Sequence, residues 1–169
     1  SSHKIDYRSI MPTNLYGPRN SYHPENSHVI AALIYRFHDA KIKKKPKVVI
    51  WGTGRPRREF LYVDDMARAS IFLMNLNKKI YYKKISQRCS HINVGSGEDI
   101  SIKKLSELIK NIIGYKGEIF FNPNKPDGTM RKLIDSKKIT KLGFKPQVNL
   151  RKGLEITYSH YLNLLNANI

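Results

Sequence analysis

Apolar residues recur every third or fourth position in several stretches of this chain, and short continuous apolar runs separate those stretches. Residues 26–44 have the helical spacing, with Asn26 or Ser27 as the expected N-cap and Pro46 as the helix end. Residues 48–51 form a continuous apolar run of strand length. This part of the sequence therefore predicts a helix followed by a strand, an order typical of layered α/β proteins.

The remaining elements continue this alternation. Strands are predicted over residues 6–11, 60–63, 91–95 and 118–121. Helices are predicted from Asp64 or Asp65 to residue 76, from Ser101 to Gly114, over 136–142 and over about 150–165. The first of these helices is expected to bury Met66, Ala69, Ile71, Phe72 and Leu76. Loops are predicted over residues 12–18, 77–90 and 123–130.

Length and composition fit one domain or part of a larger protein. The chain has 169 residues, of which 40% are hydrophobic, so it can bury a core. No apolar run approaches the roughly 20 residues of a membrane-spanning helix. The single cysteine, Cys89, excludes an internal disulfide, and no Cys/His cluster has zinc-finger spacing. We therefore expect no metal site and a reducing, cytoplasmic environment.

The formal net charge is +18, from 31 Lys and Arg against 13 Asp and Glu. Such a charge attracts anions, and nucleic acid, acidic lipid or a phosphorylated small molecule all fit it. Much of the excess is lysine beside many Ile, Asn and Tyr, a mixture typical of a solvated surface from an AT-biased genome. The interleaved basic and aromatic pattern of an RNA-binding sheet is not visible. The charge does not choose the partner, and a basic nucleic-acid-binding domain stays open as an alternative.

Several enzyme signatures are missing from the sequence. A dinucleotide-binding turn needs a Gly-rich loop, because only glycine lets backbone N–H groups approach a pyrophosphate. Gly52-Thr53-Gly54 and Gly95-Ser96-Gly97 each lack a third glycine at the right spacing, and no tyrosine is followed by lysine four residues later. P-loop, zincin, nucleophile-elbow and kinase signatures are absent as well. Taken alone, the chain lacks a complete catalytic apparatus.

Longer motifs nevertheless occur in a fixed order along the chain. They are Asn14-Leu15-Tyr16-Gly17-Pro18, His23-Pro24-Glu25-Asn26-Ser27-His28-Val29-Ile30, Trp51-Gly52-Thr53-Gly54, Arg58-Glu59-Phe60-Leu61-Tyr62-Val63-Asp64-Asp65-Met66, His91-Ile92-Asn93-Val94-Gly95, Gly114-Tyr115-Lys116-Gly117 and Lys125-Pro126-Asp127-Gly128-Thr129. Over residues 6–165 the chain closely resembles the GDP-L-fucose synthase family, which are extended short-chain dehydrogenase/reductases. The first and fourth motifs occur across nucleotide-sugar epimerases and dehydratases, whereas the second and the last together point to this family.

The resemblance implies an α/β fold made of the last strands of a Rossmann-type parallel sheet and a small C-terminal α/β substrate-binding domain. Residues 1–169 would then be a single C-terminal fragment. Mixed Rossmann and substrate elements are implied at about 6–24, 48–52, 60–76 and 91–95, and mainly substrate-binding elements at about 25–47 and 98–169. In this family the Gly-rich loop, the Tyr/Lys pair and a catalytic cysteine lie upstream of the first motif. The N-terminal cofactor-binding part is therefore expected to be missing.

The implied reaction is epimerisation of GDP-4-keto-6-deoxy-D-mannose at C3 and C5, followed by reduction at C4 with NADPH to give GDP-L-fucose. Epimerisation needs an acid and a base on opposite faces of the sugar, and His28 matches the family histidine that donates the proton. The alternative interpretation is that His28 is only a polar neighbour of a helix cap. Cys89 does not match the family cysteine.

Motif positions imply the remaining site residues. The nicotinamide end of NADP(H) would be held by Pro12, Thr13, Asn14, Leu15 and His28. The substrate would be bound by Arg36, Trp51, Arg58, Asp127 and Lys132. Arg58 suits a diphosphate because guanidinium presents a planar fork of donors, and Trp51 suits stacking or packing. Asp127 would accept a ribose or sugar hydroxyl, and Lys132 would contact phosphate. Glu118 stands where relatives often have a basic residue, which shifts the expected diphosphate contacts onto Arg36, Arg58 and Lys132.

The implied partner of the full-length enzyme is a GDP-sugar substrate, and the implied assembly is a homodimer, with no nucleic acid and no membrane partner. The chain by itself is expected to be inactive and to bind no cofactor tightly. Another nucleotide-sugar epimerase or dehydratase stays open as an alternative, as does a binding subunit without catalysis.

Overall fold

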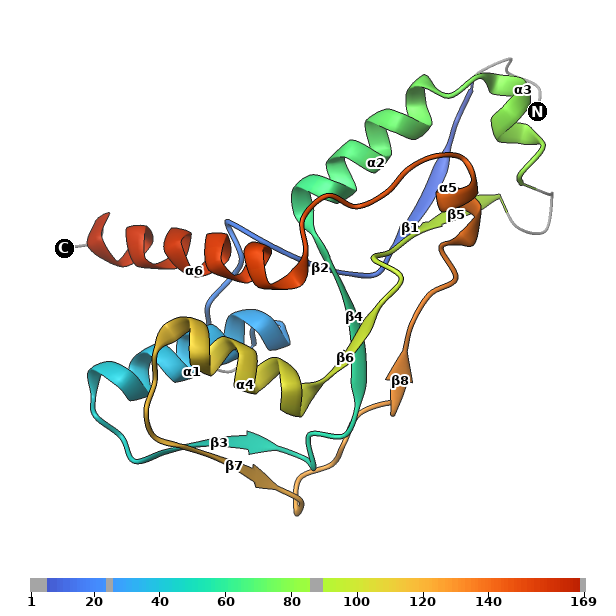
Figure 1. The fold of residues 1–169 in the computed structure, drawn as a ribbon. Coiled ribbons are helices and arrows are strands. Elements are labelled where there is room, and N and C mark those ends of the chain that lie inside the picture. The colour runs from blue at the N-terminus through green and yellow to red at the C-terminus, as the bar shows by residue number, and fades with distance from the viewer. Residues whose placement is uncertain (1–5, 24–25, 86–89, 168–169) are drawn as a thin grey trace.

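The computed structural model describes residues 6–23, 26–85 and 90–167, which form an α/β fold in two lobes (Figure 1). The strands are β1 (Ser9–Pro12), β2 (Asn14–Tyr16), β3 (Lys47–Trp51), β4 (Arg57–Tyr62), β5 (His91–Val94), β6 (Asp99–Ser101), β7 (Glu118–Asn122) and β8 (Arg131–Lys132). The helices are α1 (Val29–Ile42), α2 (Val63–Asn75), α3 (Lys78–Tyr82), α4 (Ile102–Ile113), α5 (Lys137–Lys141) and α6 (Leu150–Ala167). The predicted α/β class is confirmed.

The strands of the described residues pair in three small sheets. They pair as β1–β5, as β2–β4–β6 with β8 also alongside β4, and as β3–β7. The β4–β6 pair is antiparallel and the other pairs are parallel. Parallel strands need crossover connections, which the helices between them supply.

One strand, β4, contributes to the cores of both lobes. Phe60 and Tyr62 belong to the core of the larger lobe, whereas Leu61 between them belongs to the core of the smaller lobe. This division follows from the geometry of a strand, in which successive side chains point to opposite faces. The larger lobe contains α1, α4, α6 and the β3–β7 pair, and the smaller lobe contains β1, β5, α2, α3 and α5 (Figure 1).

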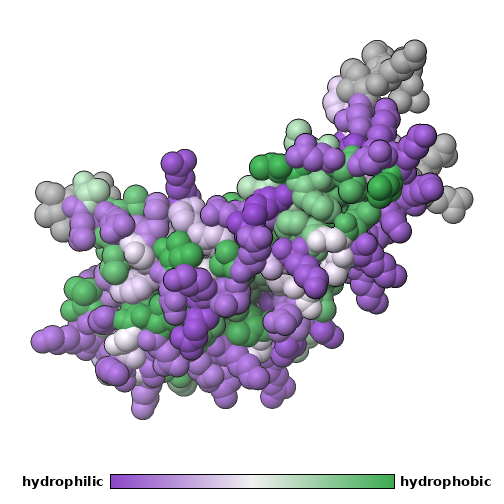
Figure 2. All heavy atoms as spheres, turned by 45° about the horizontal axis from the view of Figure 1, so that its top comes forward, coloured by the Kyte–Doolittle hydropathy of each residue, from purple (hydrophilic) through white to green (hydrophobic). Residues whose placement is uncertain are grey.

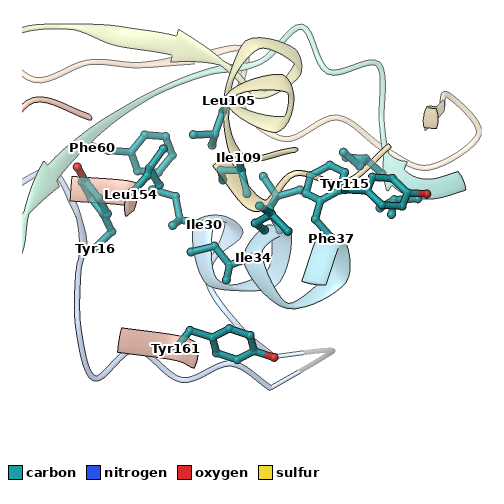
Figure 3. Packing of buried hydrophobic residues seen from close by; sticks show 14 of the residues in the cluster. Tyr16, Ile30, Ile34, Phe37, Phe60, Leu105, Ile109, Tyr115, Leu154 and Tyr161 are labelled. Carbon is teal, nitrogen blue, oxygen red and sulfur yellow. The ribbon is translucent and has the colours of Figure 1, made fainter. Parts of the chain in front are cut away.

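The core of the larger lobe is built around α1. Its buried side chains Ile30, Ile34 and Phe37 lie on one face of the helix and pack with Leu105 and Ile109 of α4 (Figure 3). Burying a side chain of this size contributes about 1.5–3 kcal/mol. The apolar face of α1 therefore fixes the position of this helix, which lines both cavities described below.

The predicted N-cap of α1 is wrong. The helix begins at Val29, and its N-cap is His28, whose side chain makes no capping hydrogen bond. The backbone N–H of Asn26 and the hydroxyl of Ser27 both donate to His23. The Ser27 hydroxyl is therefore not available to cap the helix, which begins at Val29.

The predicted start of α2 and one of its inward positions are also wrong. The helix begins at Val63, before either aspartate, and Asp65 lies buried inside its first turn. Ile71 is 60% exposed, whereas Ala69 and Leu73 are buried. At 100° per residue, Ile71 lies on the opposite side of the helix from Ala69.

Three short elements lie in segments predicted as loops or connections. These are β2 within 12–18, β6 at Asp99–Ser101 and α3 within 77–90. Tyr81 of α3 is completely buried, and its hydroxyl accepts from the backbone N–H of Ser9. The segment 77–90 is therefore partly anchored to the core, while residues 86–89, with Cys89, lie outside the described residues.

The predicted limits of α4 are confirmed. The Ser101 hydroxyl accepts a hydrogen bond from the backbone N–H of Lys104, as an N-cap does. Gly114 ends the helix with a φ of 74°, in the left-handed region that glycine adopts without a Cβ clash.

Hydrophilic side chains cover much of the face shown in Figure 2, and hydrophobic ones gather over the smaller lobe. Exposed apolar side chains of this lobe include Ile71 and Met74 of α2. None of the helices within 6–23, 26–85 and 90–167 combines the length and the apolar character that crossing a bilayer demands.

Candidate functional site

Four of the five predicted substrate-binding residues line one cavity. Arg36 of α1, Trp51 at the end of β3, Arg58 of β4 and Asp127 of the loop after β7 surround a space of about 270 Å³. The remaining wall is largely apolar, and it includes Leu33 of α1. The cavity therefore combines two guanidinium groups and one indole ring with an apolar wall, a set suited to an anionic aromatic ligand.

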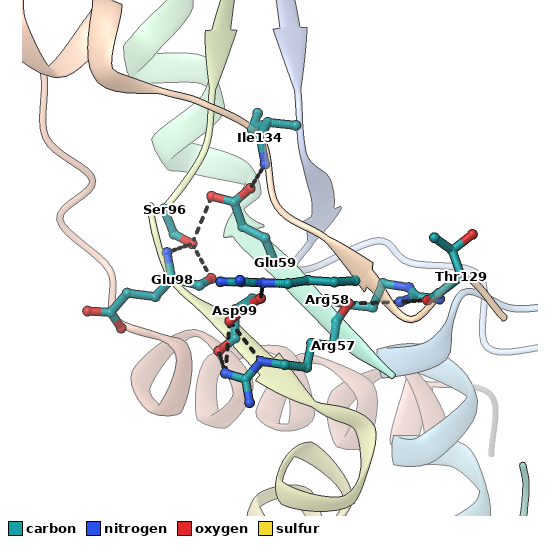
Figure 4. A network of polar contacts seen from close by, with 9 residues as sticks. Arg57, Arg58, Glu59, Ser96, Glu98, Asp99, Thr129 and Ile134 are labelled. Carbon is teal, nitrogen blue, oxygen red and sulfur yellow. Dashed lines mark hydrogen bonds and ion pairs between the residues drawn. The ribbon is translucent and has the colours of Figure 1, made fainter. Parts of the chain in front are cut away.

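The two arginines of this cavity have donors to spare. Arg58 Nη1 donates to the backbone carbonyl oxygens of Arg57 and Thr129, at 2.8 and 2.5 Å (Figure 4). The Nε and Nη2 groups of Arg58 make no hydrogen bond with the described residues, and neither does the half-buried guanidinium of Arg36. Both side chains can therefore donate to phosphate oxygens without first breaking an ion pair.

Asp127 is held by the turn that follows β3. Its Oδ1 accepts from the backbone N–H of Thr53 at 2.8 Å, and its Oδ2 accepts from the Thr53 hydroxyl at 2.6 Å. These two bonds hold the pKa of the Asp127 carboxyl below its usual value, the side-chain bond being the larger cause. Gly52 makes room for the carboxylate, because a Cβ at Gly52, where φ is +80°, would lie 2.2 Å from Oδ1.

Trp51 stands at the rim of the cavity with 63% of its surface exposed. The ammonium nitrogen of Lys125 lies 5.3 Å from the centre of its indole ring, which is within cation–π range. The sequence predicted stacking or packing for Trp51 and no role for Lys125. Lys125 opens the last of the motifs quoted above, but the motif did not indicate that its side chain contacts Trp51.

Lys132, the fifth predicted substrate-binding residue, does not line the cavity. It lies on β8 as the register partner of Arg58 on β4, and its side chain is exposed. Glu118 lies on β7 opposite Lys47 and does not line the cavity either.

Residues predicted to contact the cofactor gather at a second cavity of about 320 Å³. Asn14, Leu15 and the exposed His28 line it, and Val29 lines both cavities. Pro12 and Thr13 do not line it but lead directly into β2 from β1. The predicted proton donor His28 thus lies outside the cavity that holds Arg36 and Arg58, in the space next to it.

Thr13 and Asn14, two of the residues predicted to contact the cofactor, both donate to the backbone carbonyl of Glu59. The Asn14 amide nitrogen donates to this oxygen at 2.8 Å, and the Thr13 hydroxyl donates to it at 3.3 Å. The backbone N–H of Thr13 donates to the carbonyl of Val94. These bonds leave the amide oxygen of Asn14, a residue that lines the second cavity, without a partner among the described residues.

Two acidic residues that sequence reasoning did not assign hold the strands beneath the site (Figure 4). Glu59 is completely buried, and its carboxylate accepts hydrogen bonds from two segments, residues 96–97 and Ile134. Asp99 forms ion pairs with Arg57 and Arg131, and the hydrogen bond from Arg57 is the first cause of the lowered pKa of Asp99. The motif Arg58-Glu59-Phe60 contains Glu59, but nothing in a local pattern identifies its distant partners.

No group of three or more His, Cys, Asp or Glu side chains suited to a metal ion occurs in the described part of the chain.

Comparisons with known proteins give a consistent result. Residues 1–95 match the model of the NAD dependent epimerase/dehydratase family. The chain is 51% identical over 166 residues to Probable GDP-L-fucose synthase 1 of Oryza sativa subsp. japonica, covering 98% of this chain and 48% of that protein. It is 50% identical over 157 residues to GDP-L-fucose synthase of Escherichia coli (strain K12), covering 93% and 49%. The chain spans about half the length of the curated relatives it matches.

Solved structures with similar folds include sugar-nucleotide enzymes. A GDP-6-OMe-4-keto-L-xylo-heptose reductase from C. jejuni has a TM-score of 0.84 and 34% identity, covering 93% of this chain and 54% of that one. A GDP-L-fucose synthetase from Naegleria fowleri has a TM-score of 0.81 and 26% identity, covering 94% and 47%, and one such structure has NADP bound.

Proposed function

Because this chain belongs to the NAD dependent epimerase/dehydratase family, we propose that it forms the GDP-sugar-binding part of a GDP-L-fucose synthase. The observation that carries the proposal is the convergence of Arg36, Trp51, Arg58 and Asp127 on one cavity from four separate segments. Relatives that bear this name are about half identical to the chain over nearly its whole length, which supports the same choice of substrate class.

The cavity would bind the nucleotide through charge and stacking. Arg36 and Arg58 would donate to the diphosphate, since their free N–H groups suit its oxygens. The exposed ring of Trp51 would stack against an aromatic ring of the ligand. Asp127, already fixed by Thr53, would accept a hydroxyl of the ribose or sugar with its remaining lone pairs. Lys132 would add a positive charge beside Arg58.

The epimerisation would use His28 as the proton donor. A 4-keto group makes the C–H bonds at C3 and C5 acidic, so a base can remove each proton and leave an enolate. His28 would then return a proton to the carbon on the opposite face, a transfer that imidazole performs well near neutral pH. Its exposed ring, in the cavity next to the arginines, supports this role.

NADPH, when bound, supplies the hydride that reduces C4. The second cavity suits only one end of such a cofactor, and the free amide oxygen of Asn14 fits a carboxamide there. Pro12, Thr13, Asn14, Leu15 and His28 are the residues of this chain that we propose hold the nicotinamide end. The printed sequence contains no Gly-rich dinucleotide turn, so we expect weak cofactor binding and no turnover by this chain alone.

We assign the chain to the C-terminal, substrate-binding portion of the enzyme, with the boundaries given above for its mixed and substrate-binding segments. A homodimer and a cytoplasmic location stay predictions for the full-length enzyme, as does the absence of nucleic acid and membrane partners.

A GDP titration of the chain tests the proposal. Wild-type protein is expected to bind GDP, and Arg58→Ala to bind it roughly 10- to 100-fold more weakly, because a hydrogen bond to a charged group contributes about 1.5–3 kcal/mol. Arg55→Ala is the matched control, since Arg55 is exposed, three residues away and outside the cavity lining. Equal affinities of wild type and Arg58→Ala would remove Arg58 from the site.

Two rival functions give different outcomes in the same assay. UDP binding as tight as GDP binding would favour another nucleotide-sugar epimerase or dehydratase. Oligonucleotide binding that falls steeply with salt, without competition by GDP, would favour a nucleic-acid-binding domain.

A further inference from the structure

Glu59 lies where one edge of β4 changes its partner. Residues 57 and 58 of β4 pair with β8, whereas residues 60–62 pair with β2 on the same edge, because β6 occupies the opposite edge. Glu59 is the single residue between the two pairings. A break in a strand ladder leaves the register of each partner to be fixed by other contacts.

The Glu59 side chain supplies such contacts. Its Oε2 accepts from the backbone N–H of Ile134 at 3.1 Å, two residues beyond β8. Its Oε1 accepts from the hydroxyl of Ser96 at 3.4 Å (Figure 4). The same oxygen accepts from the backbone N–H of Gly97 at 2.8 Å. The carboxylate is completely buried, so these donors replace the water that it has lost.

Gly95 leaves the space that this carboxylate occupies. A Cβ at Gly95 would lie 2.3 Å from Oε1 of Glu59, closer than side-chain atoms approach one another. An amide in place of the carboxylate would turn an NH₂ group toward one of the backbone N–H donors, and two donors cannot bond. The pocket is thus specific for a side chain that accepts on both oxygens.

The segment held by Glu59 carries Lys132. Its other end is held by a 2.7 Å hydrogen bond from the backbone N–H of Arg57 to the carbonyl of Met130. Between these two hydrogen bonds, Lys132 lies opposite Arg58 in the register of β8 and β4. On the cofactor side, the backbone carbonyl of the same Glu59 receives the Asn14 amide.

We propose that Glu59 is a positioning residue that sets the register of residues 130–134 on β4 and thereby places Lys132 beside Arg58 at the ligand diphosphate. The inference rests on the proposed function for the identity of the ligand. Glu59 itself touches no ligand and acts through Lys132.

A double-mutant cycle on GDP binding tests this role. Glu59→Gln and Lys132→Gln are each expected to weaken GDP binding about threefold to fivefold, the effect of one exposed ionic contact. In the double variant the second substitution should cost nothing further, because Glu59 acts through Lys132. Binding of guanosine, which has no phosphate, should not change. Glu107→Gln, at an exposed position on α4, is the control and should bind like wild type.

Several results would overturn the proposal. One is that Glu59→Gln binds GDP as tightly as wild type. Another is that the effects of Glu59→Gln and Lys132→Gln on GDP binding add fully in the double variant. A third is that the variants lose guanosine binding as much as GDP binding. If the wild-type protein binds no GDP, that result contradicts the proposed function instead. Hydrogen exchange then tests whether Glu59 holds residues 130–134 in register on β4. The Ile134 amide of wild-type protein should exchange at least roughly tenfold more slowly than in an unstructured chain, although it lies outside any strand. Exchange at the unstructured rate refutes the role of Glu59 even if no variant folds.

Discussion

The ammonium group of Lys125 lies over the indole ring of Trp51, with 5.3 Å between the nitrogen and the ring centre. Trp51 is the one tryptophan of the sequence, so its fluorescence reports on the rim of the cavity alone. A ligand ring that stacks on the face covered by Lys125 has to displace the ammonium. In the free protein, Lys125 therefore competes with the ligand for one face of the Trp51 ring.

Replacing Lys125 with methionine should strengthen guanosine binding about twofold to fivefold, because an exposed cation–π contact contributes about 0.5–1 kcal/mol that the ligand no longer has to break. Methionine keeps the length of the side chain without its charge. Fluorescence titration of Trp51 with guanosine measures the change, and Lys116→Met, outside the cavity lining, serves as the control. Unchanged or weaker guanosine binding would show that the ligand ring does not use this face of Trp51.

Replacing Thr53 with valine should loosen the loop that carries Asp127. The variant loses the hydroxyl donor to Oδ2 and keeps the backbone donor to Oδ1. The pKa of Asp127 should therefore rise toward its ordinary value of 3.8, and GDP should bind several-fold more weakly. An NMR titration of the carboxyl and a GDP titration measure the two effects.

Thr129→Val, an exposed change in the same loop, is the control for Thr53→Val. An Asp127 pKa and a GDP affinity that both stay at wild-type values would refute the anchoring role of Thr53.

Features that depend on contacts between residues close in the sequence could be predicted, whereas features that depend on distant residues could not. The limits of α4 were predictable because Ser101 and Gly114 act within one turn of the helix. The strands β2 and β6 have three residues each, and pairing with β4 rather than their own pattern defines them.

The candidate site also depends on contacts between residues that lie far apart in the sequence. The partners of the Glu59 carboxylate lie 37, 38 and 75 residues away in the chain, so no local pattern can indicate them. Arg36 and Arg58 could be chosen beforehand only through motifs that resemble a known family. Hydrophobic periodicity placed Arg36 on a helix but could not show that β4 would bring Arg58 to the same cavity.

His38 is expected to make the free energy of unfolding depend on pH between neutral pH and mild acid. It lies on α1, where its Nδ1 is 3.0 Å from the hydroxyl of Tyr158 and its ring contacts Tyr161 of α6. Burial, followed by the charge of Lys41, lowers the pKa of His38 below its ordinary 6.5. As the pH falls through 6.5, His38 therefore binds a proton more readily in the unfolded chain than in the folded chain. This part of the stability is complete above pH 6.5 and is lost as the pH falls.

The expected result for His38→Gln is a smaller loss of unfolding free energy between pH 7.5 and 5.5 than wild type shows. Urea denaturation at the two pH values measures it. Asn111→Gln, an exposed change on α4 that removes no titratable group, is the control and should keep the wild-type pH dependence. The same pH dependence in His38→Gln as in wild type would contradict the assignment to His38.

Asp65 connects the first turn of α2 to the segment before α6, and its removal should cost about 3 kcal/mol of stability. The carboxylate is completely buried and accepts from the backbone N–H groups of Gln147 and Val148 at 2.8 and 2.9 Å, and also from Arg68. Asp65→Ala leaves two part-buried N–H groups and a guanidinium without their acceptor, which is the costly way to break such a contact. Asp64→Ala is the matched control: it removes an exposed carboxylate from the same helix turn and should cost under about 1 kcal/mol. Urea denaturation of both variants measures the difference, and equal stabilities would mean that α2 is held to the larger lobe by its apolar contacts alone.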